Sequence, residues 1–301
     1  MASANSGLQI TNLDFGSIKN SLKSFLQQQD KLKDYNFDGS SLSILLDLLA
    51  YNTQYNAYYL NMVANEMFLD SAVQRGSVVS HAKLLNYLPH SAVSPKATVN
   101  TVFYQVNTST LTLPKGTSFI SEAIEGTNYN FVTNDSYTVN VVANTAIFNG
   151  ISLYQGIPSS FSYTYNSTSN PKQIFDILDA NVDLNTLKVT VQESSSSLVY
   201  ETYEKATDYL NIDSTSKVFF LQEGMNGNYQ IYFGDGILGK QLQDGNIVLV
   251  NYLSTSGSAG GLANSYTLMD NLGVTTAPSI VSQGQATQGS DKESIARSEE
   301  H

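Results

Sequence analysis

A glycine-rich stretch in the C-terminal half matches the sequence motifs of phosphate-binding loops. Residues 234–240 read Gly-Asp-Gly-Ile-Leu-Gly-Lys, which fits both GxGxxG and GxxxxGK. Either motif requires a helix directly after the loop, with its N-terminus facing the phosphate. Here a second turn, Asp244-Gly245, follows within a few residues, and Gln241 stands where a P-loop has Ser or Thr. We therefore expect no nucleotide cofactor and interpret the glycines as parts of tight β-turns. The glycines assigned to such turns are Gly227, Gly234, Gly236, Gly239 and Gly245.

Residue types that ligate metals or act as nucleophiles do not form a recognisable site. His81, His90 and His301 are not at ligand spacing, and the sequence contains no Cys. It contains neither a GxSxG elbow nor an HExxH motif. The many acidic residues of the C-terminal part leave a glycosidase-like carboxylate pair open, although nothing marks any two of them. We expect no catalytic residue, no cofactor and no metal, and hence no enzyme.

The charge distribution argues against nucleic acid as a partner. The chain has 15 basic and 26 acidic residues, a formal net charge of −11. Residues 1–96 are balanced and residues 97–301 carry the excess of acid, whereas phosphate binding needs clustered Lys and Arg. Only 14% of residues are charged, against a usual share of about 25%. Such a surface loses little solvation when another protein covers it, which favours an assembly component. No apolar run is long enough for membrane insertion, and no secretory signal begins the sequence.

The first third of the chain has the period of amphipathic helices. Asp14 can cap a first helix, and a turn at 36–41 separates it from a long helix over about 42–68. Asp70 can cap a third helix, which Pro89 stops. The apolar positions of the first and third helices are Ile18, Leu22, Phe25, Leu32, Val73, Val78, Ala82 and Leu85.

One stripe of the long helix has apolar residues at spacing 4-3-4-3-4, the pattern of a helix packed along another helix. Half of its members are Tyr, which bury a large ring, keep a polar tip and are enriched at interfaces. An intrachain core among the three helices and a docking surface for a second chain both fit this stripe. Glu66, near the helix end, fits a buried hydrogen-bonding role or a solvated position, and we favour the second. The stripe, called the seam below, consists of Ile44, Leu48, Tyr51, Tyr55, Tyr58 and Met62.

After a boundary at 91–95 the hydrophobic period changes to two, as in strands. The dipeptides Asn226-Gly227, Asp235-Gly236 and Asp244-Gly245 are strong hairpin signals, so residues 217–253 are expected to form an antiparallel meander. Residues 159–170 predict a loop or an irregular edge, and 254–264 a flexible crossing. The expected strands are 97–106, 111–113, 118–120, 129–132, 137–142, 187–191, 198–203, 218–221, 229–233 and 247–253.

Together these patterns predict an α+β chain, with an N-terminal helical bundle region followed by mainly antiparallel β structure. We expect residues 1–92 to form the helical oligomerisation region. Residues 93–282 should form the β part, with two subdomains that split near 150–185 as an open alternative.

Three segments resemble the baseplate wedge proteins of T4-like contractile-tailed phages. Residues 37–89 (FDGSSLSILLDLLAYNTQYNAYYLNMVANEMFLDSAVQRGSVVSHAKLLNYLP) resemble their N-terminal helical region. Residues 231–257 (IYFGDGILGKQLQDGNIVLVNYLSTSG) are similar to the β domain of these wedge and baseplate-J-like proteins. Residues 289–297 resemble the start of the next family block, which gives way here to Ser-Glu-Glu-His. The resemblance therefore implies that 283–301 begin a further, truncated block.

The resemblance implies that the chain has a structural role in a virion. Wedge proteins of this family pair through their N-terminal helices with a second copy and with other wedge subunits, and they build a ring around the tail hub. The sheath initiator and hub proteins are further candidate partners. The implied location is the phage tail baseplate, assembled in the host cytoplasm. The alternative is a glycan-binding adhesin, which would need exposed aromatic platforms in the β region, or another tail-associated β-domain protein.

Overall fold

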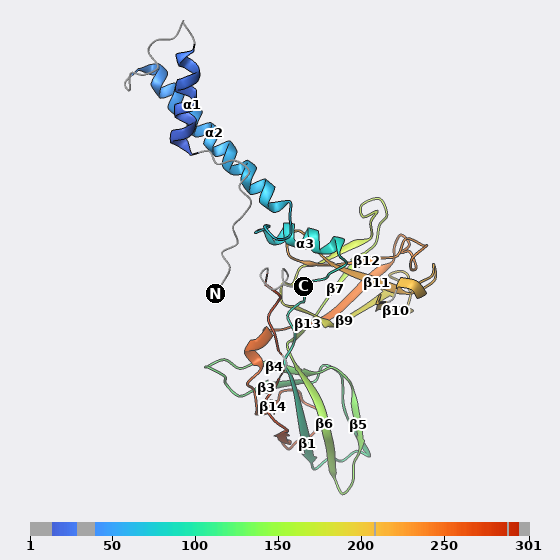
Figure 1. Cartoon of the computed structure of the whole chain (residues 1–301). Helices are drawn as coiled ribbons and strands as arrows, with labels where there is room; N and C mark the ends of the chain where they lie inside the picture. Colours follow the sequence, from blue (N-terminus) through green and yellow to red (C-terminus); the bar gives the residue numbers. More distant parts are fainter. Residues whose placement is uncertain (1–13, 29–39, 208, 288, 295–301) are drawn as a thin grey trace. The chain divides into compact units, whose positions relative to one another are not determined.

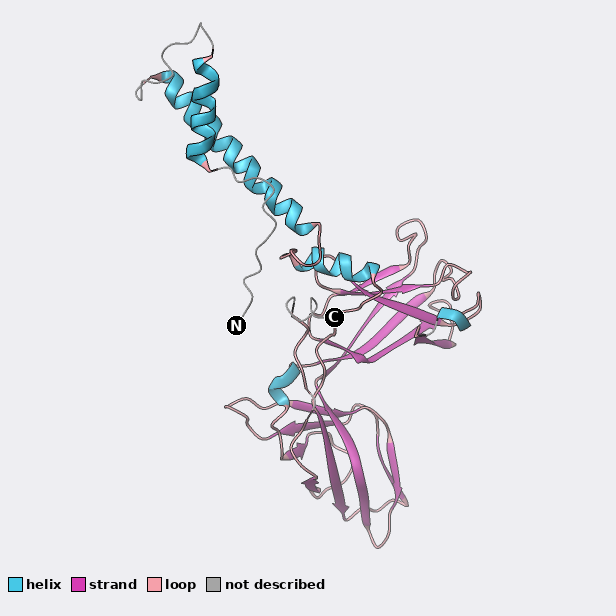
Figure 2. Ribbon diagram, viewed as in Figure 1, coloured by secondary structure: helices cyan, strands magenta, loops and turns pink. Residues whose placement is uncertain are grey.

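The computed structural model describes residues 14–28, 40–207, 209–287 and 289–294. Three helices are followed by strands that are mostly antiparallel, which confirms the predicted α+β class (Figures 1 and 2). The chain divides into a helical unit, up to Tyr87, and a β unit, Leu88–Ser294. Among the described residues, no helix is long and apolar enough to cross a membrane. The helices are α1 (Phe15–Gln27), α2 (Ser41–Glu66) and α3 (Arg75–Leu84).

The first two helices begin at side-chain caps. The Asp14 carboxylate accepts a 3.0 Å hydrogen bond from the Ser17 amide, and the Ser40 hydroxyl accepts one of the same length from Ser43. Each bond satisfies an amide that has no partner within its own helix. Residues 29–39, which include the expected position Leu32 and most of the expected turn, lie outside the described residues.

The third helix starts later than expected. We predicted a cap at Asp70, but α3 begins at Arg75 with Gln74 as its N-cap residue. The physical reason lies at the end of α2. The Glu66 carboxylate accepts hydrogen bonds from the amides of Val73, at 3.0 Å, and Gln74, at 3.2 Å. The carboxylate of Glu66, at the end of α2, therefore supplies the acceptor that the local pattern assigned to Asp70.

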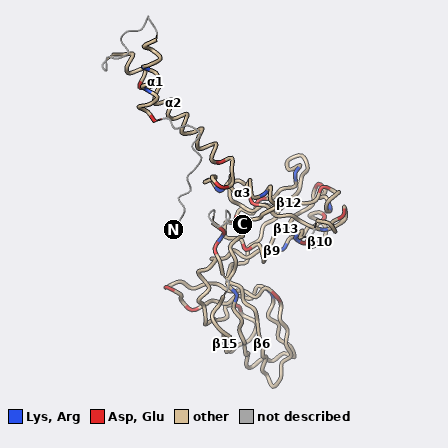
Figure 3. Tube along the Cα trace, in the orientation of Figure 1, with Lys and Arg blue, Asp and Glu red and all other residues tan. Residues whose placement is uncertain are grey.

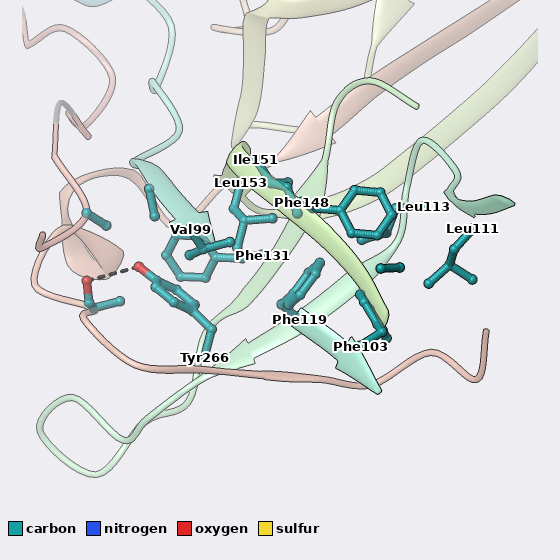
Figure 4. Packing of buried hydrophobic residues seen from close by; sticks show 14 of the residues in the cluster. Val99, Phe103, Leu111, Leu113, Phe119, Phe131, Phe148, Ile151, Leu153 and Tyr266 are labelled. Carbon is teal, nitrogen blue, oxygen red and sulfur yellow. Dashed lines mark hydrogen bonds between the residues drawn. The ribbon is translucent and has the colours of Figure 1, made fainter. Parts of the chain in front are cut away.

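The first β domain has a six-stranded sheet, in the order β14-β3-β4-β6-β1-β15, and a separate β2-β5 pair. Its core is rich in phenylalanine, which comes from inward-facing positions of β1, β3, β4 and β6 (Figure 4), and burial alternates along β1 and β3. Rings of Phe103 and Phe148 meet edge to face with centroids 5.7 Å apart. Its strands are β1 (Lys96–Tyr104), β2 (Thr110–Leu113), β3 (Ser118–Ser121), β4 (Asn130–Thr133), β5 (Tyr137–Asn140), β6 (Thr145–Gln155), β14 (Tyr266–Leu268) and β15 (Ser279–Ser282).

The second β domain is a seven-stranded sheet in the order β7-β13-β9-β10-β11-β12-β8, with its own apolar core. Residues 157–164, most of which we expected to be a loop or an irregular edge, form an edge strand of this sheet. Its strands are β7 (Ile157–Thr164), β8 (Ile174–Ile177), β9 (Val182–Gln192), β10 (Tyr200–Lys205), β11 (Val218–Glu223), β12 (Tyr229–Phe233) and β13 (Ile247–Ser254).

The expected meander over 217–253 is wrong after its first hairpin. β11 and β12 form the antiparallel hairpin that Asn226-Gly227 predicts, and Gly227 has a φ of +82°. β13, however, pairs with β7 and β9. The reason is that β11 and β8 already occupy both edges of β12, so β12 has no free edge for another strand.

The end of the described chain packs back on the β unit. Ser290 pairs with Val93, and Glu293 exchanges two hydrogen bonds with the backbone of His90. We call residues 289–294 the C-terminal strap. The segment expected to be a flexible crossing, 254–264, lies beside it, with buried glycines and an Asp291 carboxylate that accepts from the Ser258 amide. Of the block expected over 283–301, residues 295–301 lie outside the described part.

Candidate interaction surface

The seam lies on the outside of α2. All six of its side chains are exposed, from 38% for Met62 to 65% for Ile44. The two charged residues of α2, Asp47 and Glu66, lie outside this stripe, and most of the helix is drawn without charge in Figure 3. A water-exposed apolar stripe of this length is unusual on a soluble surface and is typical of surfaces that another molecule covers.

The opposite side of α2 carries the residues that the helical unit buries. Ser43, Ala50, Ala57 and Ala64 recur every seven residues, and Leu46 lies beside them. At about 100° per residue these positions fall on the side of the helix away from the seam. α1 packs against α2, with Ile18 buried and the Lys19 ammonium 2.5 Å from the Asp47 carboxylate. The chain therefore uses the small-residue side of α2 for its own packing.

Tyrosines form a connected ladder along the exposed side. The rings of Tyr51 and Tyr55 stack with centroids 6.1 Å apart, and Tyr55 meets Tyr59 edge to face at 4.6 Å. The hydroxyls of Tyr55 and Tyr59 share a 2.7 Å hydrogen bond, which raises the pKa of Tyr55 above its ordinary value. These contacts hold the rings in place before any partner arrives, which lowers the entropy lost on docking.

A second group of exposed apolar residues widens the surface. With the seam they cover about half of the helix circumference, estimated at about 100° per residue. Within the described residues, the intrachain-core interpretation of the seam is not supported, because these side chains are open to solvent. The docking interpretation stays a prediction. The flanking residues are Leu45, Leu49, Tyr59, Leu60 and Val63.

The glycine loop after β12 has the geometry of packed turns. The Asp235 carboxylate accepts from the amides of Ile237 and Leu238, at 2.9 and 3.0 Å. A Cβ on Gly234 would lie 2.3 Å from the carbonyl oxygen of Gly239, so this position has no room for a side chain. The Gly239 amide donates a hydrogen bond to the backbone carbonyl of Asp213, which holds the glycine loop against the loop before β11. β13, and no helix, is the next element after this loop.

Three more of the predicted turn glycines have a positive φ, as Gly227 does. Gly236, Gly239 and Gly245 have φ of +86°, +88° and +88°, the left-handed region that glycine enters without strain. They lie on the β unit and the seam lies on the helical unit, so the structure describes the two predicted residue groups as parts of separate units.

Two of the histidines that we considered as metal ligands make hydrogen bonds that involve a backbone group. The ring Nε2 of His81 lies 3.0 Å from the carbonyl oxygen of Glu66, and the His90 amide donates to Glu293. His301 lies outside the described residues. Among the residues that the structure describes, no three His, Asp or Glu gather as metal ligands would.

Exposed tyrosines of the β unit lie on separate elements. Tyr104 ends β1, Tyr200 begins β10, and Tyr209 stacks on Phe220 with centroids 5.7 Å apart. A glycan platform would need such rings gathered around a groove. We find no observation in the described residues that favours the adhesin alternative.

Glu66 has a role that sequence reasoning did not assign. Its side chain is partly exposed, in keeping with the solvated position that we favoured, and its carboxylate accepts the amides of Val73 and Gln74 just before α3. Burial disfavours its charged form, yet hydrogen bonds from Ser77, Val73 and Gln74, and the nearby His81, outweigh burial and lower the pKa of Glu66. The available signal was a carboxylate nine residues before a helix whose N-cap residue makes no side-chain capping hydrogen bond.

Glu66→Gln is expected to loosen α3 at neutral pH, because a helix cap is worth about 0.5–2 kcal/mol. The pKa of Glu66 is lowered in the folded chain, so its contribution is complete above the ordinary glutamate pKa and is lost as pH falls through the lowered value. Hydrogen exchange of residues 73–84, corrected for intrinsic rates, should show this pH step in the parent chain and not in the variant. Asp70→Asn is the control and should keep the step; its loss there would contradict the assignment.

Comparisons with known proteins match both units. Residues 14–87 match the family described as baseplate wedge protein gp6-like, helical domain, and residues 162–262 match bacteriophage baseplate wedge protein gp6, third domain. The chain is 28% identical over 276 residues to baseplate wedge protein gp6 of Enterobacteria phage T4, covering 86% of this chain and 40% of that protein. It thus spans less than half of that relative's length. A chain of the anti-feeding prophage baseplate structure aligns with a TM-score of 0.30 and 12% identity, over 96% of this chain and 51% of that one.

Proposed function

Because the chain carries the helical domain and the third domain of gp6-like baseplate wedge proteins, we propose that it is a structural subunit of a contractile-tail baseplate wedge. Its place is then the tail baseplate of the virion, and its role is assembly without catalysis. The observation that carries the proposal is the exposed, tyrosine-bearing seam of α2. An apolar face of this length has no use on an isolated subunit, whereas an assembly buries it.

The partner that the seam fits first is a second copy of the chain. A stripe at heptad-like spacing is complementary to another such stripe, so two α2 helices can pack seam to seam. At about 25 cal/mol per Å² of apolar surface, a standard interface of about 800 Å² per partner supplies ample gross stabilisation, which association and ordering costs then reduce. The flanking residues offer a further side for other wedge subunits, with the sheath initiator and hub proteins as additional candidates.

Two properties support a protein partner over a nucleic acid. The β unit carries the excess of acid, and α2 has almost no charge. Neither surface could displace counterions from phosphates. A seam that docks through apolar area should also keep its affinity as salt rises, because ionic screening acts on charges.

Sedimentation velocity over a micromolar concentration series tests the proposal. We expect species larger than the monomer, with little change between low and high salt. A compact monomer throughout the series would contradict the proposal that a second copy covers the seam.

A further inference from the structure

A cleft of about 500 Å³ lies within the β unit, where the two β domains meet. The first domain contributes the β2–β3 turn and the end of β4, and the second contributes β7, β9 and β13. β6 passes into β7 through one residue, Gly156, whose carbonyl accepts a 2.9 Å hydrogen bond from the Asn130 side chain. The cleft walls are therefore tied together by the chain itself.

Two lysines converge on this cleft from different domains. Lys115 comes from the β2–β3 turn and Lys188 from β9, 73 positions later in the sequence. Burial and, next, the neighbouring Lys188 ammonium together lower the pKa of Lys115 to about 8, although Asp135 acts in the opposite direction. No carboxylate is among the residues that line the cleft. Tyr252 is one of them, and burial, together with the nearby Asp179, raises the pKa of its hydroxyl to about 12.

Three other lysines of the acidic β unit are paired with carboxylates, whereas among the described residues Lys115 and Lys188 are not. Lys217 and Lys240 both lie within salt-bridge distance of Glu201, at 3.2 and 2.6 Å, and Lys292 pairs with Glu223. Lys115 and Lys188 form no ion pair with any residue that the structure describes. Two like charges brought together repel each other, Asp135 offsets only part of this repulsion at Lys115, and an anion between the two ammonium groups would relieve the rest.

The rest of the lining suits an anion with several acceptor oxygens. Ser160 on β7, Thr190 on β9 and Asn251 on β13 bring hydroxyl and amide donors to the same cleft. Both lysine side chains stay open to solvent, so a ligand can reach them. Hydrogen bonds from ammonium groups to oxyanions are short and are stronger than neutral ones.

We propose that this cleft binds an oxyanion between Lys115 and Lys188. The oxyanion is either the carboxylate of an acidic side chain from a neighbouring subunit or a free phosphate ion. The seam plays no part, so this proposal and the proposed function can fail separately. In an assembled particle, a neighbour's carboxylate at this position would fix the two β domains against each other.

Calorimetric titration of the full chain with inorganic phosphate and with glutarate, at neutral pH and low salt, tests the proposal. We expect at least one of the two to bind with a Kd on the order of 1 mM. A preference for glutarate would identify a protein carboxylate as the ligand, and a preference for phosphate would identify a free ion.

The variants Lys115→Gln and Lys188→Gln should each weaken binding at least about tenfold, because each removes one of two charge-assisted donors. Lys172→Gln removes an exposed lysine outside the cleft and is the matched control. The proposal is overturned if neither anion binds the parent chain, or if either cleft variant binds as the control does.

Discussion

The Tyr55→Asp variant should remain monomeric at concentrations where the parent chain associates. Tyr55 is in the middle of the seam and touches Tyr51 and Tyr59 in the ring ladder. Truncating a central aromatic at an interface commonly costs about 2 kcal/mol or more, and an aspartate there would also be buried without a partner. We therefore expect association to weaken at least about a hundredfold, measured by sedimentation equilibrium.

Thr53→Asp is the matched control for this variant. It adds the same charge to the same helix, at an exposed position about 160° round from Tyr55 at about 100° per residue. It should associate nearly as the parent chain does. Equal loss in both variants would mean that the added charge, and not the seam, is responsible, and the seam assignment would fail.

Lys292→Met should lower the free energy of unfolding of the β unit by about 3 kcal/mol, because it removes the ammonium that lies beside a fully buried carboxylate. The Lys292 ammonium lies 3.0 Å from a Glu223 carboxylate oxygen, and the Glu223 side chain is fully buried. The ammonium also donates to the Gly227 carbonyl and lies 4.5 Å from the Tyr229 ring centroid. The strap is thereby fastened to the β11–β12 hairpin.

Urea unfolding followed by circular dichroism measures this effect, since the chain has no Trp for fluorescence. Lys240→Met removes the 2.6 Å pair with Glu201, in which both side chains are partly exposed, and should cost under about 1 kcal/mol. The double variant Glu223→Leu with Lys292→Met should regain most of the loss, because it removes both buried charges together. If the two single lysine variants were equally stable, the buried pair would not hold the strap.

The sequence by itself determined the features that depend on near neighbours. The 4-3-4-3-4 spacing placed the seam residues on one side of α2, because a helix repeats every 3.6 residues whatever surrounds it. Asn226-Gly227 predicted its hairpin because both central positions of such a turn favour residues that tolerate positive φ. The class of the fold follows from the same two local periods.

The tertiary structure alone decided which distant residues meet. It placed β13 between β7 and β9, fastened Lys292 to Glu223 across 69 positions, and brought Lys115 to Lys188 across 73. It also gave Glu66 its role, because the amides that it accepts from, those of Val73 and Gln74, lie in the turn that leads into α3. Periodicity and turn chemistry record interactions over a few residues, whereas strand order and ion pairing are set by the packing of the whole chain.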